Sequence, residues 1–228
     1  RFPGKILADL CGKPLIQHVW ERVRTCSRLS DLLIACDETH VAERCGAFGA
    51  KTVMTRPDHP SGSDRIAEAV EKIACDIVVN VQGDEPLIEP ALVDALVREA
   101  EQSGAPMVTA MARIKKIEDL KDPNVVKVVC NTQGDALYFS RSPIPYRRDA
   151  GVADPSGRFR HLGIYAYQKS FLLEYCRWPK SFLETEEKLE QLRVLEAGHR
   201  IRCVITGTEA IGVDTPEDLD RVARILKG

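Results

Sequence analysis

A mostly apolar segment that ends at an acidic turn constrains this chain more than any other feature. Residues 77–81 read Ile-Val-Val-Asn-Val, and a Gly-Asp-Glu-Pro turn follows at 83–86. Such a β-branched run is typical of a buried parallel strand, and ligands bind at the carboxyl edge of parallel sheets. We therefore predict that Asp84 lies at this edge. Residues 212–216, Gly-Val-Asp-Thr-Pro, have the same pattern, so Asp214 is expected at an edge as well.

Composition excludes several classes of protein. The 228 residues are 44% hydrophobic, which suits one large domain with a real core. A net charge of −2 and a pI near 6.3 argue against a basic nucleic-acid surface. No apolar run approaches the ~20 residues of a membrane-spanning helix, and no secretory signal is visible, although the chain begins without Met.

Cysteine usage indicates a reducing compartment. The chain has eight cysteines, none of them in a C-x-x-C pair, and several sit inside apolar runs. We expect buried or half-buried free thiols in a cytoplasmic protein, and neither a disulfide scaffold nor a zinc site.

The first half alternates strands with helices. Strands are expected at 32–36, 51–54 and 77–81, and helices at 15–24, 39–48, 65–74 and 90–102, while residues 1–13 look loop-like. This alternation predicts an α/β fold with a mostly parallel central sheet flanked by helices.

The second half has more β character. Strands are expected at 107–114, 125–130, 136–140, 161–167 and 201–205, and Asn-Thr-Gln-Gly-Asp at 131–135 indicates a hairpin. A capping box of Ser181 and Glu184 precedes a helix predicted over 185–197, and Pro216 opens the last helix. We predict a single domain over 1–228, in which 124–167 forms a hairpin flap or dimer arm.

Two loops have the composition of anion sites. Gly4 and Lys5 combine backbone that can approach a phosphate closely with a point charge, although an exposed turn explains them equally well. Residues 61–65, Ser-Gly-Ser-Asp-Arg, offer hydroxyls, a helix amino terminus and Arg65 to a nucleotide. The alternative is an ordinary loop in which Ser63 caps the helix and Arg65 is solvated.

Gln82 and Asp84 combine an amide that can read a base with a carboxylate suited to Mg²⁺. Magnesium prefers a few carboxylates together with phosphate oxygens. Asp84 and Asp214 are therefore candidate metal ligands, and the alternative is an aspartate that only turns the chain.

The hairpin half holds candidates for binding an acidic sugar. Arg141, His161 and Tyr165 could do so, with the last two on one face of a strand, although cross-strand packing favours a structural role for that pair. Glu190 and Gln191 lie off the stripe of Leu189 and Leu192, which by itself is typical of a solvated helix face.

The chain lacks the motifs of covalent catalysis and of the common nucleotide loops. No Ser/His/Asp arrangement, Walker loop or G-x-G-x-x-G is present. Two acids with a phosphate loop instead fit direct nucleotidyl transfer, in which catalysis is positioning and charge neutralisation.

Taken together and in order, the motifs identify a family. The chain resembles the 3-deoxy-manno-octulosonate (Kdo) cytidylyltransferases over essentially its whole length. The matching segments are Pro-Gly-Lys at 3–5, Ser-Gly-Ser-Asp-Arg at 61–65, Val-Asn-Val-Gln-Gly-Asp-Glu-Pro at 79–86, Ala-Leu-Tyr-Phe-Ser-Arg at 136–141, His-Leu-Gly-Ile-Tyr at 161–165, Leu-Glu-Gln-Leu-Arg at 189–193 and Val-Asp-Thr-Pro-Glu-Asp at 213–218.

The resemblance implies a cytoplasmic, Mg²⁺-dependent homodimer with a glycosyltransferase-A-like fold. It implies the reaction of CTP with Kdo to give CMP-Kdo and pyrophosphate, which activates the sugar for lipopolysaccharide synthesis. The family roles it implies are metal binding by Asp84 and Asp214, phosphate binding by Lys5, nucleotide binding by Gly62, Ser63, Arg65 and Gln82, and sugar binding by Arg141, His161, Tyr165, Glu190 and Gln191.

The chain departs from the family pattern at two places. The family begins with an apolar strand and a Pro-Ala-Arg segment, which are missing before Arg1, and Ser63 replaces the usual Thr. The alternatives are therefore a cytidylyltransferase for another acidic sugar, of the sialic acid type, or a catalytically silent truncated subunit.

Overall fold

The computed structural model describes residues 2, 4–148, 155–208 and 211–228. Arg1 and Pro3 of the amino-terminal motif, and 149–154 of the predicted arm, lie outside the described residues. The chain divides into two compact units. The first unit comprises Arg1–Cys75, Asn80–Ala95 and Glu209–Gly228, and the second comprises Asp76–Val79 and Leu96–Thr208. The prediction of a single domain over 1–228 stays a prediction.

The first unit contains a small parallel β-pair against which helices α2 (Thr39–Ala47) and α3 (Gly62–Val70) pack. Its elements are η1 (Lys5–Leu7), β1 (Asp9–Leu10), β2 (Lys13–Pro14), α1 (Leu15–Val23), β3 (Leu33–Cys36), α2, β4 (Lys51–Met54), α3, the start of α4 (Pro90–Ser103) and α9 (Pro216–Lys227). Strands β3 and β4 pair in parallel through the connecting helix α2. Their carboxyl ends therefore lie at one edge, where Asp37 and Thr55 follow them.

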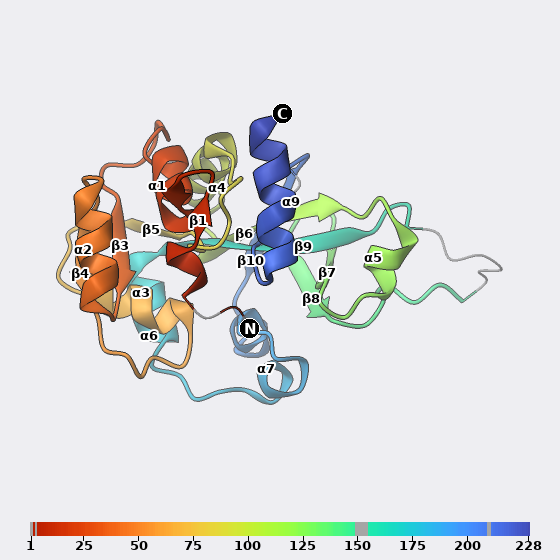
Figure 1. Ribbon diagram of the computed structural model, residues 1–228. Helices are drawn as coiled ribbons and strands as arrows, with labels where there is room; N and C mark the ends of the chain where they lie inside the picture. Colours follow the sequence, from red (N-terminus) through yellow and green to blue (C-terminus); the bar gives the residue numbers. More distant parts are fainter. Residues whose placement is uncertain (1, 3, 149–154, 209–210) are drawn as a thin grey trace. The chain divides into compact units, whose positions relative to one another are not determined.

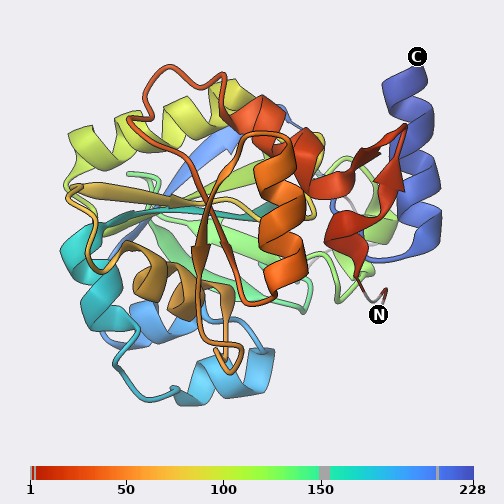
Figure 2. The same cartoon turned by 60° about the vertical axis from the view of Figure 1, so that its left-hand side comes forward.

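An amino-terminal hairpin packs against the carboxy-terminal helix. Leu10 and Leu15 form one buried cluster with Val213 and Val222 of the last segment, and Figure 2 shows β1 and β2 beside α9. The prediction that residues 1–13 are loop-like is wrong for this hairpin. Its strands have only two residues each, and the turn is set by Cys11 and Gly12, both with positive φ (53° and 86°), as a two-residue hairpin turn requires.

The second unit is built on a six-stranded sheet. Its strands are β5 (Ile77–Asn80, which the first unit shares at Asn80), β6 (Met107–Arg113), β7 (Lys127–Cys130), β8 (Ala136–Ser140), β9 (Phe159–Gln168) and β10 (Ile201–Thr206). The order is β10-β6-β9-β7-β8, and β5 also pairs with β9 (Figure 1). The helices of this unit are the rest of α4, α5 (Ile117–Lys121), α6 (Lys169–Tyr175), α7 (Phe182–Glu187) and α8 (Gln191–Glu196).

The predicted α/β fold with a central sheet and flanking helices is confirmed, but this sheet is mixed rather than mostly parallel. β10 and β6 run parallel, whereas β6–β9, β7–β9 and β7–β8 are antiparallel. The difference arises because the predicted hairpin is present as β7 and β8, and β7 pairs with β9. The hairpin thus extends the sheet instead of standing apart from it.

The β6–β9 pairing contains an irregularity of two residues. Ala110 pairs with Leu162, but the preceding Thr109 pairs with Tyr165 instead of residue 163. Because side chains alternate with a period of two, an excess of two residues leaves the face of every side chain unchanged. His161 and Tyr165 therefore stay on the same face, as predicted.

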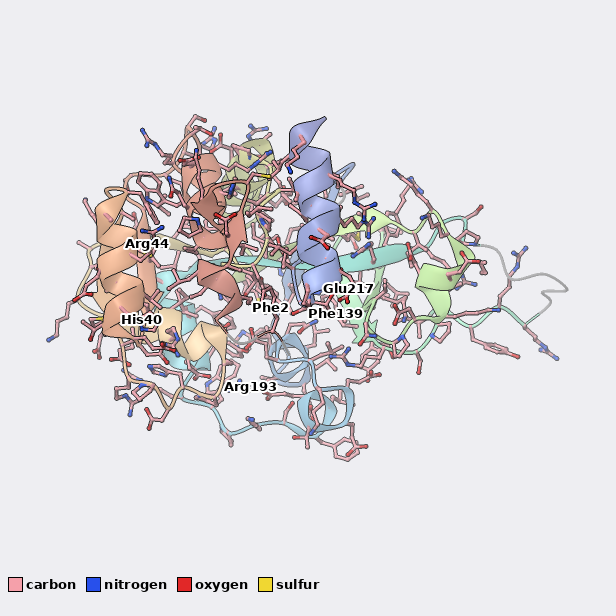
Figure 3. The ribbon with its side chains drawn as sticks, in the orientation of Figure 1. Phe2, His40, Arg44, Phe139, Arg193 and Glu217 are labelled. Carbon is pink, nitrogen blue, oxygen red and sulfur yellow. The ribbon has the colours of Figure 1, made fainter. Side chains whose placement is uncertain are left out.

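The region after 180 forms two short helices rather than the single helix predicted over 185–197. The capping box of Ser181 and Glu184 is confirmed, but α7 ends at Glu187, and Lys188 after it adopts the left-handed conformation (φ 55°) before α8 begins. Arg193 of α8 (Figure 3) turns back to α7, and its Nε lies 2.9 Å from Glu184 Oε2. Both side chains are buried, so their ion pair joins the two helices.

The eight cysteines are free thiols, as expected, but Cys11 is exposed because it occupies the tip of the β1–β2 hairpin. In the described ranges of the chain, the helices are too short or too polar to cross a bilayer.

Removing one member of the buried ion pair should destabilise the second unit. Glu184→Gln leaves the Arg193 guanidinium buried without its counter-charge, and we expect a loss of about 3–5 kcal/mol in the free energy of unfolding. Urea denaturation followed by circular dichroism measures it. Glu186→Gln, on the exposed side of α7, is the matched control and should change stability by less than about 0.5 kcal/mol. Equal stability of the two variants would contradict the prediction.

Candidate active site

Two loops of the first unit place Asp84 and Asp214 side by side. The backbone N–H of Val213 donates to the carbonyl of Asp84 at 2.9 Å, which joins the acidic turn after β5 to the segment before α9. Gly83 makes this turn fit closely, because a Cβ there would lie 2.9 Å from Ile16 Cδ1 of α1. The sequence prediction that the two aspartates come together is therefore confirmed.

Lys5 bridges the two carboxylates. Its Nζ lies 2.5 Å from Asp84 Oδ2 and 2.8 Å from Asp214 Oδ1, across 79 and 209 residues of sequence. Gly4, with a left-handed φ of 66°, caps the short helix that carries Lys5. Partial burial lowers the pKa of Lys5, but the hydrogen bonds and charges of Asp214 and Asp84 outweigh burial and leave it raised. The ammonium therefore stays protonated.

This arrangement can hold a divalent cation. Two carboxylates from separate loops converge on one positive group, and that donor set suits Mg²⁺, which takes few protein carboxylates and completes its shell with water and phosphate oxygens. Over the described residues, no group of three or more His, Cys, Asp or Glu side chains is placed to hold a metal ion. A metal held by these two carboxylates would therefore take its other oxygens from water or a ligand.

Helix α3 begins at a loop that can receive a nucleotide. Ser61 is its N-cap and accepts from the N–H of Asp64, so the alternative that Ser63 caps the helix is wrong; Ser63 is buried instead. A Cβ on Gly62 would lie 4.0 Å from both Asn80 Nδ2 and Gln82 Oε1, so these two amides face the start of the helix. Asn80 is 3% exposed, and its Nδ2 has no hydrogen-bond partner in the part of the chain described.

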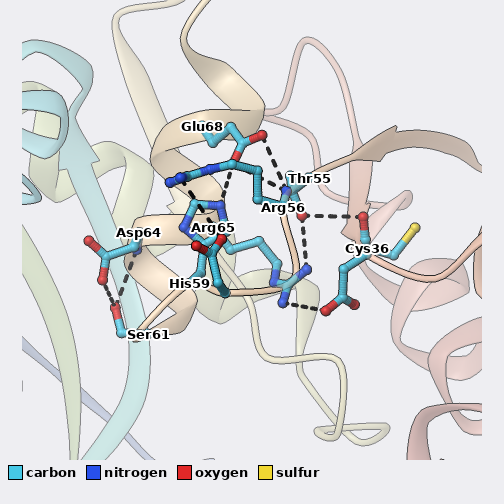
Figure 4. A network of polar contacts seen from close by, with 10 residues as sticks. Cys36, Thr55, Arg56, His59, Ser61, Asp64, Arg65 and Glu68 are labelled. Carbon is cyan, nitrogen blue, oxygen red and sulfur yellow. Dashed lines mark hydrogen bonds and ion pairs between the residues drawn. The ribbon is translucent and has the colours of Figure 1, made fainter.

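Arg65 is held by the ends of two strands. Its Nη2 lies 2.9 Å from Asp37 Oδ2 after β3, and its Nη1 donates to Thr55 Oγ1 at 2.8 Å after β4 (Figure 4). The alternative of a solvated Arg65 is therefore wrong. A guanidinium has five N–H donors, and these two contacts leave three of them unused. The Asp37 carboxylate largely neutralises the positive charge of Arg65. His59 hydrogen-bonds Glu68 in the same network.

In the second unit, His161 and Tyr165 lie together on β9. Their ring centroids are 5.4 Å apart, and Phe139 of β8 (Figure 3) packs edge-on against His161 at 4.9 Å. His161 Nε2 lies 2.8 Å from Thr109 Oγ1. Burial lowers the pKa of His161 to about 3, so its imidazole is neutral near pH 7.

Arg141 follows β8 and is fixed by backbone oxygens. Its Nε donates to Glu187 O at 2.7 Å and its Nη1 to Pro123 O at 2.9 Å. Its own backbone carbonyl accepts from the fully buried Lys127. Carbonyls carry no net charge, and among the residues with described positions the guanidinium forms no ion pair. Its positive charge thus remains available to an anionic ligand.

Glu190 and Gln191 begin α8. The interpretation as a solvated face is wrong for Gln191, which is 2% exposed because α8 packs into the second unit. Its Nε2 has no partner within the described ranges, whereas the backbone carbonyl of Glu190 accepts from Tyr175. A buried, unsatisfied amide costs free energy, which a ligand acceptor would recover.

Sequence reasoning missed three polar residues that support these candidates, namely Asp37, Asn80 and Thr109. Each stands at the end or in the interior of a predicted strand, where a polar side chain is a weak signal. Their contacts join segments far apart in sequence, so only the fold reveals them.

Comparison with known proteins gives consistent results. A family model described as cytidylyltransferase matches residues 1–201. A 3-deoxy-manno-octulosonate cytidylyltransferase of Geobacter sulfurreducens is 48% identical over 100% of this chain and 94% of its own length. One from Solibacter usitatus is 49% identical over 100% and 90%.

Solved structures agree with these relatives. The structure of CMP:2-keto-3-deoxy-manno-octonic acid synthetase complexed with CTP matches with a TM-score of 0.93 and 43% identity, covering 100% of this chain and 93% of that one. A 4-diphosphocytidyl-2C-methyl-D-erythritol synthase from Anaerococcus prevotii matches with a TM-score of 0.67 but 9% identity, covering 98% and 93%, and so shows a common fold alone.

The neutral state of His161 predicts a pH dependence of stability. The unfolded chain binds a proton near pH 6.5 and the folded chain only near pH 3, so the free energy of unfolding falls as the pH drops through this window. Between pH 7 and pH 5 His161 contributes about 2 kcal/mol of this loss. We expect His161→Gln to reduce the loss by that amount in urea titrations at the two pH values.

The control for this experiment is His40→Gln, which replaces an exposed histidine of α2 (Figure 3). The control should lose as much stability as the unchanged chain between the two pH values. A His161→Gln protein that behaves like the control would contradict the burial of a neutral imidazole.

Proposed function

This chain belongs to the 3-deoxy-manno-octulosonate cytidylyltransferase family, and we propose that it transfers CMP from CTP to the anomeric hydroxyl of Kdo. The hydroxyl attacks the α-phosphorus in line and pyrophosphate leaves. The product is CMP-Kdo, the activated sugar for lipopolysaccharide synthesis. The observation that carries this proposal is the convergence of Asp84, Asp214 and Lys5 at one point of the first unit.

Asp84 and Asp214 are the residues that hold Mg²⁺ in this proposal. When bound, the ion neutralises the triphosphate oxygens and favours charge transfer to the leaving pyrophosphate. The two carboxylates fit this role because they already face a single cationic group, the Lys5 ammonium. Lys5 binds the phosphates as a point charge, and its raised pKa keeps it charged at the pH of the reaction.

The loop at the start of α3 binds the nucleoside part of CTP. Gly62 and Ser63 lie at the helix amino terminus, and Gln82 faces Gly62 from the end of β5. Arg65 supplies N–H donors from a fixed position because Asp37 and Thr55 hold it. Its charge is largely neutralised, so its role is hydrogen bonding more than attraction of the triphosphate.

The second unit binds the sugar acid. Arg141 pairs with the carboxylate of Kdo, since the carbonyls that fix it leave its charge uncompensated. His161, Tyr165, Glu190 and Gln191 bind hydroxyl groups, and the unpartnered Nε2 of Gln191 supports this assignment. A neutral sugar leaves Arg141 without its partner, which explains selection of an acidic sugar.

We propose further that the enzyme is a cytoplasmic homodimer. The absence of disulfides among the eight cysteines fits a reducing compartment. Exposed Leu137 and Tyr146 in the hairpin region are candidate dimer contacts, and light scattering measures the oligomeric state directly.

The function is tested by pyrophosphate release from CTP. We expect release that requires both Kdo and Mg²⁺, that stops with a chelator, and that sialic acid does not support. Release with sialic acid but not Kdo would identify a different acidic sugar, and no release with either would identify a silent subunit.

Asp84→Asn should lower kcat by roughly a hundredfold or more, because a charged metal ligand is lost while the shape is kept. Asp214→Asn should have a similar effect. Asp220→Asn, an exposed aspartate of α9, is the matched control and should retain normal turnover. Near-normal turnover in Asp84→Asn would rule out the metal assignment.

A further inference from the structure

The hydroxyl of Thr109 occupies the irregular point of the β6–β9 pairing. Thr109 is fully buried, and its Oγ1 lies 2.8 Å from Ile164 O and 3.2 Å from Leu162 O. The same oxygen lies 2.8 Å from His161 Nε2. One buried hydroxyl thus contacts two carbonyls at the irregular segment and the imidazole next to it.

These three contacts fix the direction of the hydrogen bonds. A threonine hydroxyl has one hydrogen to donate and lone pairs that accept. Carbonyl oxygens can only accept, so the hydrogen is donated to them, Ile164 O being the nearer. The contact with His161 therefore requires that Nε2 carries the hydrogen and donates to Thr109. A neutral imidazole has only one N–H, so Nδ1 is an acceptor.

We propose that Thr109 is a positioning residue for the sugar site, one that locks His161 in the Nε2–H tautomer and presents Nδ1 as an acceptor for a hydroxyl of the sugar acid. This inference rests on the proposed function, which places His161 at the sugar. Thr109 itself is buried behind His161 on β6 and acts through it. The neighbouring rings of Phe139 and Tyr165 restrict the imidazole further.

The desolvation of the half-buried imidazole makes the lock necessary. Two neutral tautomers of histidine differ little in energy in water, so the partner of one nitrogen decides which nitrogen carries the hydrogen. Desolvation keeps the imidazole neutral near pH 7, which means that it cannot donate from both nitrogens. With Thr109 fixed as the acceptor, the site binds a hydroxyl donor at Nδ1 and discriminates against a group that only accepts.

The experiment compares Thr109→Val, which keeps the shape and removes the hydroxyl, with Thr109→Ser, which keeps the hydroxyl. ¹⁵N spectra of histidine-labelled protein at pH 7.5 report which nitrogen of His161 is protonated, and the signal missing in His161→Gln assigns the resonances. We expect the Nε2–H tautomer in the unchanged chain and in Thr109→Ser. In Thr109→Val we expect a tautomer mixture.

Steady-state kinetics give the second readout. Thr109→Val should raise the KM for Kdo about tenfold, the effect of losing an oriented hydrogen bond, and leave the KM for CTP within about twofold. Thr109→Ser should restore the KM for Kdo. Thr52→Val, the same exchange on β4 in the other unit, is the control and should match the unchanged chain in both readouts.

The outcomes separate this proposal from the proposed function. An Nδ1–H tautomer in the unchanged chain, or an unaltered tautomer in Thr109→Val, overturns the role of Thr109. A KM for Kdo that is unchanged in Thr109→Val, or that rises together with the KM for CTP, does the same. If Kdo supports no turnover in the unchanged chain, the proposed function fails, whereas the tautomer measurement still decides whether Thr109 orients His161.

Discussion

The hydrogen bond from Val213 N–H to the carbonyl of Asp84 is the interaction on which the candidate metal site depends. It joins two loops from opposite ends of the sequence and sets the spacing of their acids. Val213, which donates this hydrogen bond, is also packed in a buried cluster with Leu10, Leu15 and Val222. Carboxylates this close repel each other, so a cation has to accompany them. Backbone and core thus hold a charge arrangement that side chains alone would not maintain.

The candidate sites of the two units differ in their electrostatics. The first concentrates full charges on partly exposed groups, which Lys5 and its aspartates illustrate. Among the candidate sugar residues of the second are uncharged hydrogen-bonding groups, namely the half-buried imidazole of His161 and the buried amide of Gln191. Charges suit a triphosphate, which must be attracted and neutralised. Uncharged donors and acceptors suit the hydroxyls of a sugar, and in the proposed function the charge of Arg141 pairs with its single carboxylate.

Local patterns predicted most elements of this fold. The hairpin at 131–135, the capping box at Ser181 and the proline start of α9 follow from short-range chemistry and are present. The two-residue strands of β1 and β2 were missed because they are too short for any period to show. The break at Lys188 was missed because a lysine seldom adopts the left-handed conformation, so no Gly or Asn marks the end of the helix. The convergence of Asp84 and Asp214 could be predicted from their positions after a strand and before a helix, but the lysine between them could not.

The even length of the irregular segment in β9 has a consequence for engineering and for aligning distant relatives. An insertion of two residues leaves the inward and outward sets of side chains intact, whereas a deletion of one would invert every position between it and the next irregularity. Length variation at this place is therefore expected in pairs. A designer who wishes to change the strand next to His161 can add or remove two residues together without inverting the faces of the rest of the strand.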